Sequence, residues 1–276
     1  MATPEAPLRE ILKSISFTQF PLYHQASFFT PTAITRAQLH ICRHTSSSTN
    51  TTNSGSPTLD IQSLRTLALL RFANYPVDLH CTSDPESSPD RHLPFLLLPD
   101  GSAIGASKVA EHLGVQCVGE DLAYLLMVER NLVPAIEYLL WVDPSGYETV
   151  SREGFLGRYP GLIGYLLGWQ RSAAVARELG VAQGFGAGVD GEAVYEGAFR
   201  ALDSILGRLG SKEYLAQKNG EEEVVPGALD ALVFACLNVF LEAPLASPVR
   251  SAMTRQGSQY RPLVDYTMRI LERHLA

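Results

Sequence analysis

The residues with the clearest chemical potential follow a short alternating segment near the start of the chain. Gln38–Cys42 alternates polar and apolar side chains, which predicts a β-strand, and Arg43 and His44 come directly after the thiol. Two neighbouring cations could stabilise a thiolate and make Cys42 a nucleophile. Residues 44–57, however, are almost wholly Ser, Thr, Asn and Gly, so we expect a disordered loop that holds no base in place. The favoured interpretation of Cys42 is a small buried strand residue.

A single acid lies within a long apolar segment nearer the C-terminus. Residues 227–240 read Gly-Ala-Leu-Asp-Ala-Leu-Val-Phe-Ala-Cys-Leu-Asn-Val-Phe, and a helix that is apolar on nearly every side must be buried. Gly227 can cap its start, and Asp230 can accept hydrogen bonds there from free backbone N–H groups. Capping accounts fully for a carboxylate in this position. We therefore assign Gly227 and Asp230 a structural role.

The remaining polar residues form no recognisable catalytic or metal site. His80 and His92 flank the loop 82–91, but two histidines with scattered acids do not make a metal site, and the four cysteines are also scattered. With a net charge of −7, the chain lacks the excess of basic residues that is typical of nucleic-acid binding. No uncharged apolar run of about 20 residues occurs, so no membrane span is expected. We expect no catalytic residue, no metal and no cofactor.

The first part of the chain alternates strands and helices. After the first strand, helical spacing predicts a helix over Leu59–Asn74, and alternation predicts a strand over Val77–Cys81. Residues 92–113 then read as an apolar strand, a Pro-Asp-Gly turn, a short strand and a helix. This order is typical of a thioredoxin-like domain, which we place at 38–117 with the apolar third strand at its centre. Pro94 enters that strand, where a cis proline could shape the edge of a pocket.

From residue 118 to residue 276 the pattern is helical, so an all-helical C-terminal domain is predicted. Helices are expected over 120–141 with a kink at Pro134, over 147–155, over 160–179 ending at Gly180, over 192–209 stopped by Gly210, over 227–240, and in two last helices that reach about Arg250 and cover 262–275.

Residues 1–37 have no period and are predicted to form an extended arm. The arm carries four phenylalanines among prolines and threonines: Phe17, Phe20, Phe28 and Phe29. Exposed aromatic side chains often mark interfaces, so a partner-binding arm and simple packing against the protein itself both stay open. The aromatic residues of a glycine-rich helix have the same interpretations: Tyr159, Tyr165 and Trp169. Because aromatic residues with glycines also suit a membrane interface, the arm and this helix are expected to contact a partner or a membrane, or to pack within the protein.

Together these elements resemble the glutathione-transferase fold, in which a thioredoxin-like domain precedes a C-terminal helical bundle. The proline at the third strand and the acid that caps the buried helix both fit. Four segments resemble the metaxin family in particular: Leu229–Phe234, Arg208–Ser211 with Tyr214 after it, Leu140–Asp143, and Tyr159–Arg171. The resemblance covers roughly residues 58–275, and the order and spacing of the segments are more specific than any one of them.

The resemblance implies a function in membrane-protein assembly. Metaxins are cytosol-facing subunits of the mitochondrial sorting and assembly machinery, which inserts β-barrel precursors into the outer membrane beside an Omp85-type barrel. Two metaxin-like subunits usually occur together, and one has a membrane anchor. This chain ends at Arg269–Ala276 without one, so it resembles the unanchored partner, of the fungal thirty-five-kilodalton or second-metaxin type. Its expected partners are the Omp85-type insertase, the anchored metaxin-like subunit and the precursors, at the outer membrane's cytosolic face.

The corresponding glutathione site is expected to be lost. Transferases use an acid–Ser pair at the start of the helix after the fourth strand, and here the pair reads Ala106-Ser107. The acid that would bind the ammonium group of glutathione is missing, and Ser107 is expected to be a helix cap. Cys42, Pro94 and Ser107 could at most line a vestigial pocket. The favoured hypothesis is a non-enzymatic docking subunit.

Two other functions stay open. One is an active glutathione transferase or another thiol-dependent enzyme that uses Cys42. The other is a cytosolic transferase-like adaptor for protein interactions, unrelated to mitochondria. Retained binding to glutathione would favour the first, and co-purification with ribosomal or synthetase components would favour the second.

Overall fold

The computed structural model describes residues 35–42, 58–82, 88–90, 92–157, 159, 161–183, 188–216, 225–243 and 247–275. The chain divides into two units, residues 1–34 and 35–276, and all described residues belong to the second. The predicted aromatic arm with Phe17, Phe20, Phe28 and Phe29, the loop 44–57 and the side chain of Cys42 therefore lie outside the described residues. The predicted domain boundary between residues 117 and 118 stays a prediction.

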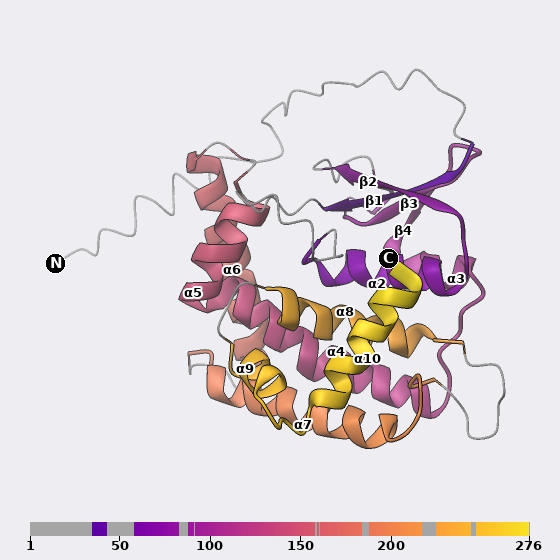
Figure 1. The fold of residues 1–276 in the computed structure, drawn as a ribbon. Helices are drawn as coiled ribbons and strands as arrows, with labels where there is room; N and C mark the ends of the chain where they lie inside the picture. Colours follow the sequence, from indigo (N-terminus) through magenta and orange to yellow (C-terminus); the bar gives the residue numbers. More distant parts are fainter. Residues whose placement is uncertain are drawn as a thin grey trace. The chain divides into compact units, whose positions relative to one another are not determined.

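A four-stranded mixed sheet forms from the first part of this unit (Figure 1). Its strands are β1 (Ala37–Cys42), β2 (Val77–Thr82), β3 (Phe95–Leu97) and β4 (Ala103–Gly105), in the order β2-β1-β3-β4. β1 pairs parallel with β2, while β3 pairs antiparallel with both β1 and β4. The apolar third strand is thus central, as predicted, with Leu96 opposite Leu39. The peptide bond before Pro94 is cis, and Pro94 is buried directly before β3.

Two helices cover the face of the sheet that is turned toward the helical part (Figure 1). They are α2 (Ile61–Phe72) and α3 (Ala106–His112). Asp60 caps α2 by accepting a hydrogen bond from the Ser63 N–H at 2.8 Å. Nine residues of α2 are buried, because Leu67 and Leu70 pack toward the sheet while other positions pack toward α8. This double burial joins the sheet layer to the helices.

The rest of the chain is helical. In order, the elements are α4 (Glu120–Glu137), the π-helical segment η3 (Tyr138–Val142), α5 (Pro144–Gly146), the π-helical segment η4 (Tyr147–Phe155), α6 (Gly161–Gln183), α7 (Gly191–Leu209), α8 (Ala228–Glu242), α9 (Pro248–Thr254), α10 (Arg261–Ile270) and the π-helical segment η5 (Leu271–Leu275). Among the described residues, no helix is both long enough and apolar enough to cross a membrane.

The helix α8 is the buried centre of this arrangement. Every residue from Ala228 to Phe240 is buried, and α8 packs against α2, α4, α9 and α10. The prediction of an all-round apolar helix at the core is therefore confirmed. The main hydrophobic core extends outward from it, through Leu132 and Ile136 of α4, to Leu202 and Ile205 of α7.

Three predicted details differ from the structure. The long fourth helix leaves α-helical geometry after Glu137 and continues as a π-helical turn; Pro134, which has no N–H to donate, lies just before this change. Residues 147–155 are likewise π-helical. The helix α6 runs through Gly180 to Gln183, because a glycine weakens a helix without ending it. Buried Ser151 links the two π-helical segments by donating to the Leu140 carbonyl at 2.5 Å.

Close packing of α6 depends on a buried glycine. A Cβ atom added at Gly168 would overlap both the Tyr147 hydroxyl and Leu156 Cδ1, whereas one added at Gly180 would meet no atom within 4 Å. The N-terminal half of α6 can therefore approach η4 only if residue 168 has no side chain.

Gly168→Ala is expected to lower the free energy of unfolding by about 1–2 kcal/mol, because two side chains must move to admit the methyl group. The control Gly180→Ala, in the same helix, should raise it by about 0.5–1 kcal/mol, since alanine is the better helix former. Urea unfolding followed by circular dichroism measures both. Equal effects of the two substitutions would contradict this packing.

Candidate functional site

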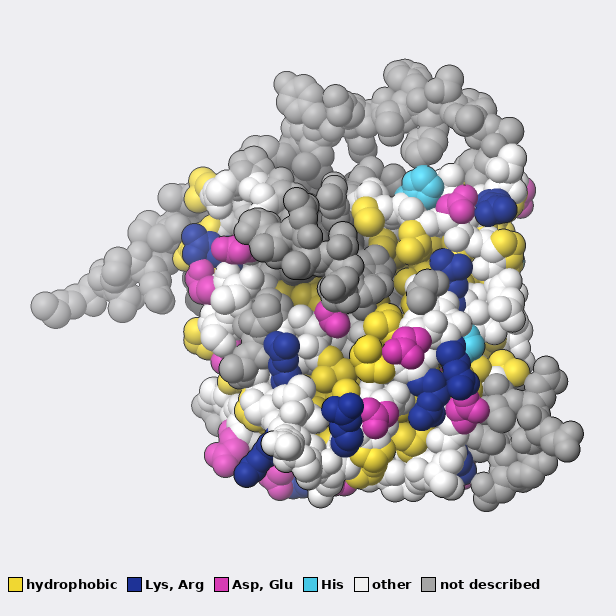
Figure 2. Space-filling view, in the orientation of Figure 1, with side chains coloured by type: hydrophobic (Ala, Val, Ile, Leu, Met, Phe, Trp, Pro, Cys, Tyr) yellow, Lys and Arg dark blue, Asp and Glu magenta, His cyan; other side chains and the backbone are white. Residues whose placement is uncertain are grey.

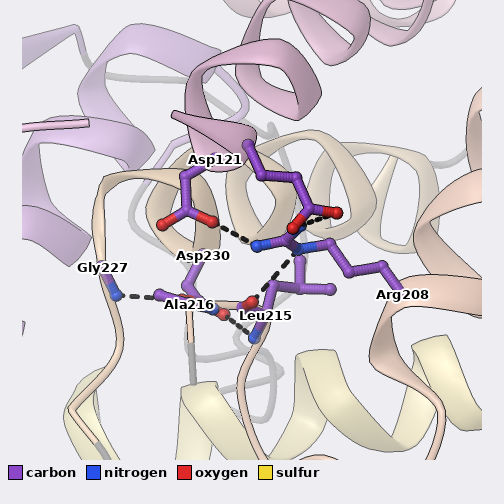
Figure 3. Close-up of polar contacts among 7 residues, drawn as sticks. Asp121, Arg208, Leu215, Ala216, Gly227 and Asp230 are labelled. Atoms are coloured by element: carbon purple, nitrogen blue, oxygen red, sulfur yellow. Dashed lines mark hydrogen bonds and ion pairs between the residues drawn. The ribbon is translucent and has the colours of Figure 1, made fainter. Parts of the chain in front are cut away.

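A buried carboxylate with four hydrogen-bond donors lies at the N-terminus of α8. Asp230 has an exposed fraction of 0%. Its Oδ2 accepts from the N–H groups of Gly227 at 2.9 Å and Ala216 at 3.2 Å. Its Oδ1 accepts from the Leu215 N–H at 2.7 Å and from the Tyr266 hydroxyl at 2.8 Å. Figure 3 shows the three backbone donors arranged around the carboxylate. One acid thus joins its own helix to the loop 211–216 and to α10.

The electrostatics of Asp230 reflect two opposing effects. Burial raises the pKa of the carboxyl group, and the hydrogen bonds from Gly227, Tyr266, Leu215 and Ala216 oppose that rise because they favour the charged form. The pKa of Tyr266 is raised well above its usual range by burial and by the adjacent Asp230. The donors to Asp230 come from three separate segments of the chain, so the arrangement is suited to holding structure.

Arg208, at the end of α7, forms the second part of this network. Its Nε donates to the Leu215 carbonyl at 3.2 Å, and its guanidinium pairs with both acids at the start of α4, Glu120 at 3.1 Å and Asp121. The guanidinium also lies over the Tyr124 ring, 4.4 Å from its centroid. Figure 3 shows Arg208 between Asp121 and Leu215. The planar fork of an arginine suits this set of partners better than a lysine would.

The loop 211–216 is held from its other side by the C-terminal helices. The Arg269 guanidinium donates to the Glu213 carbonyl at 2.8 Å, and the Tyr214 hydroxyl shares a hydrogen bond with His274 Nε2 at 3.0 Å. The start of α4, the end of α7, the start of α8 and α10 therefore meet at one short loop.

A cleft of about 550 Å³ lies between α4, α6 and α7. Its apolar lining includes Val133, Val175 and Val194, and charged side chains surround it. Arg171 pairs there with Glu137 at 3.0 Å. Burial raises the pKa of Glu137, and Arg171 opposes that rise. Figure 2 shows basic and acidic side chains side by side over the helical part of the viewed face, with no large patch of one charge.

The residues predicted to line a vestigial pocket are not brought together by any described contact. Ser107 is exposed, and the N-cap of α3 is Gly105, with no side-chain hydrogen bond. The prediction that Ser107 caps this helix is therefore wrong, because the cap lies two residues earlier and Ser107 is already within the helix. Pro94 is buried beside β3, and neither Pro94 nor Ser107 lines the cleft between α4, α6 and α7.

Two of the three described thiols, Cys117 and Cys236, have raised pKa values, and Cys81 is exposed. Burial raises the pKa of the Cys117 thiol, and it raises that of the Cys236 thiol to about 12, so both are held as neutral thiols. Within the described residues, no group of three or more His, Cys, Asp and Glu side chains could hold a metal ion.

The aromatic residues predicted at an interface divide into two groups. Tyr165 and Trp169 of α6 have exposed fractions of 65% and 57%, whereas Tyr159 is half-buried. The sequence analysis missed their apolar neighbours Leu162 and Ile163, which are 73% and 47% exposed. The spacing of residues 162, 165 and 169 on a helix could have shown that they share a face.

Comparisons with known proteins bear on these observations. A family model described as "Tom37: Outer mitochondrial membrane transport complex protein" matches residues 63–172. Metaxin-1 of Mus musculus is 28% identical over 209 residues, which cover 70% of this chain and 64% of that protein. Metaxin-2 of Mus musculus is 28% identical over 233 residues, which cover 77% of this chain and 81% of that protein.

These matches support membership of the metaxin family, as predicted. Equal identity to metaxin-1 and metaxin-2 leaves the subtype a prediction. The chain spans a little under two thirds of the length of mouse metaxin-1.

Solved structures of glutathione transferases share the fold. One transferase of Phanerochaete chrysosporium superimposes with a TM-score of 0.54 at 12% identity, covering 87% of this chain and 99% of that chain. A second from the same organism gives a TM-score of 0.53 at 9% identity, covering 85% and 96%. The predicted glutathione-transferase-like fold of this chain is confirmed, and at such identities the likeness concerns the fold alone.

Asp230→Ala should lower the free energy of unfolding by at least about 3 kcal/mol, because it leaves three backbone N–H groups and the Tyr266 hydroxyl without their acceptor. The control is Asp190→Ala, which removes the exposed cap of α7 and should cost about 1 kcal/mol. Both values come from urea unfolding. A loss at residue 230 no larger than that at residue 190 would show that the network is unimportant for stability.

Proposed function

We propose that this chain is a non-enzymatic, peripheral subunit of the mitochondrial outer-membrane sorting and assembly complex, on its cytosolic face. The observation that carries the proposal is similarity to the metaxin family. The matched family model is that of an outer mitochondrial membrane transport complex protein, and the matched residues run from α2 into α6. They therefore include both layers of the fold and part of the exposed aromatic face.

The proposed task is docking. The chain docks on the Omp85-type barrel beside a second, anchored metaxin-like subunit and assists recognition and insertion of β-barrel precursors. Such precursors present unpaired strand edges, which must be kept from wrong pairing until they enter the sheet of the barrel. The proposed contacts with the barrel rim or its surrounding lipid are Tyr165 and Trp169, which are exposed on α6, and the phenylalanines of the arm.

The geometry supports a subunit without transferase chemistry. Ala106 stands where the glutathione site of a transferase has an acid. Ser107 is exposed, and its side chain forms no described hydrogen bond. The buried acid Asp230 already accepts four hydrogen bonds, so it has no capacity left for a substrate. The fold similarity to transferases therefore supports a shared scaffold, and it does not by itself support shared chemistry.

Affinity purification from detergent-solubilised mitochondria tests this function. The tagged chain should recover an Omp85-type barrel and a second metaxin-like chain. Deletion of residues 1–31 should weaken that recovery without changing the unfolding transition, because the arm lies in a separate unit. An arm-less chain that recovers the barrel as well as the full chain would contradict the role of the arm.

The same purified material distinguishes the two alternative functions from the proposed one. Binding to immobilised glutathione, with thiol-conjugating turnover that is lost in Cys42→Ser, would replace the proposal with an enzymatic function. Recovery of ribosomal or synthetase components instead of a barrel would replace it with a cytosolic adaptor.

A further inference from the structure

In the N-terminal half of α6 two glycines are buried and several large apolar side chains are exposed. An ordinary surface helix has the opposite arrangement. Gly164 and Gly168 are buried against the η4 side. Leu162, Tyr165 and Trp169, spaced by three and four residues, are exposed by 73%, 65% and 57% on the opposite side. A soluble amphipathic helix buries its large apolar residues. Helices in lipid do the reverse, with small residues at the protein contact and large apolar residues outward.

Packing fixes this orientation. Gly168 has no room for a side chain against Tyr147 and Leu156, so α6 cannot rotate to bury its outer face there. Farther along the helix, Arg171 pairs with Glu137 at 3.0 Å and lies over the Trp141 ring, 5.8 Å from its centroid. The apolar face is thus held outward from both sides. Figure 2 shows hydrophobic side chains, with basic and acidic ones between them, at the left edge of the molecule, where Figure 1 places α5 and α6.

The chemistry of the face fits hydrocarbon with a polar boundary. Residues 161–170 contain no charged side chain, and their polar groups are limited to the Tyr165 hydroxyl, the Trp169 indole and Gln170. Tyr and Trp side chains favour the boundary between acyl chains and headgroups. A protein partner typically supplies about one hydrogen bond per 100–200 Å² of interface, and this face offers few groups to form them.

The length of the face fits a helix that lies in the plane of the membrane. Ten helical residues span about 15 Å at a rise of about 1.5 Å per residue, which is too short to cross a hydrocarbon core about 30 Å thick. A helix of this kind can lie in the boundary with its apolar side about 5–10 Å deep.

We propose that the N-terminal half of α6 inserts side-on into one leaflet of a lipid bilayer through Leu162, Ile163, Tyr165 and Trp169. The identity of that bilayer as the mitochondrial outer membrane rests on the proposed function, whereas the insertion itself does not. Because the face is uncharged, insertion depends on apolar burial and changes little with salt.

Trp169 reports on insertion directly. The chain has two tryptophans, so Trp141→Phe leaves Trp169 as the only indole. With vesicles of phosphatidylcholine and phosphatidylethanolamine, its emission should shift to shorter wavelength and be quenched by lipids brominated on the acyl chain, at low and high salt alike. Unshifted emission and no quenching at any lipid concentration would overturn the proposal.

Paired variants separate this face from other apolar surfaces. Leu162→Gln with Tyr165→Gln should weaken vesicle partitioning at least about tenfold, since each change removes a large apolar side chain from the contact. The control is Val118→Gln with Leu122→Gln, which alters a second exposed apolar pair, 67% and 42% exposed, at the start of α4. It should partition like the wild type. Thermal unfolding checks that both variants stay folded.

Recovery of the barrel and partitioning into vesicles test the two proposals separately. If the α6 variant partitions normally into vesicles but no longer recovers the barrel, this face is a protein interface, and the lipid proposal is wrong while the proposed function stands. If it loses vesicle partitioning and the wild type recovers no barrel, the lipid proposal stands and the proposed function is wrong.

Discussion

One buried carboxylate holds the helical part of this molecule together. Asp230 satisfies the start of α8 and also accepts hydrogen bonds from the loop 211–216 and from α10. A charge buried to this extent is tolerated only where donors replace water. The donors are therefore as much a part of the folded core as the apolar residues of α8. Arg208 extends this constraint by tying the same loop to the start of α4.

This constraint separates the fold from catalysis. A scaffold of the transferase type needs the capped central helix for its stability, whatever its surface does. In this chain the acid of the glutathione site is absent at Ala106, and the described buried thiols have raised pKa values. The features that distinguish the chain lie elsewhere, above all in the outward apolar face of α6. The fold shared with transferases can thus be kept while the chemistry of the surface differs.

Local patterns in the sequence were enough to predict most of the fold. Alternation located the strands, and the apolar segment with Asp230 located the central helix and its cap. The partners of Asp230 in the loop 211–216 could not be predicted, because backbone N–H donors carry no residue-type signal. The exposure of Leu162 and Ile163 could not be predicted for another reason: sequence alone does not say which side of an apolar helix is buried. That depended on Gly164 and Gly168, whose packing against η4 only the structure shows.

The central claim is that a transferase-like chain works here as a subunit of a membrane complex. The native mass of the endogenous chain in mild-detergent extracts of mitochondria tests it most directly. The account predicts that the chain migrates only within a large membrane-derived assembly that also contains the insertase barrel. A chain found as a free monomer or homodimer in the cytosol, turning over a thiol substrate, would contradict it.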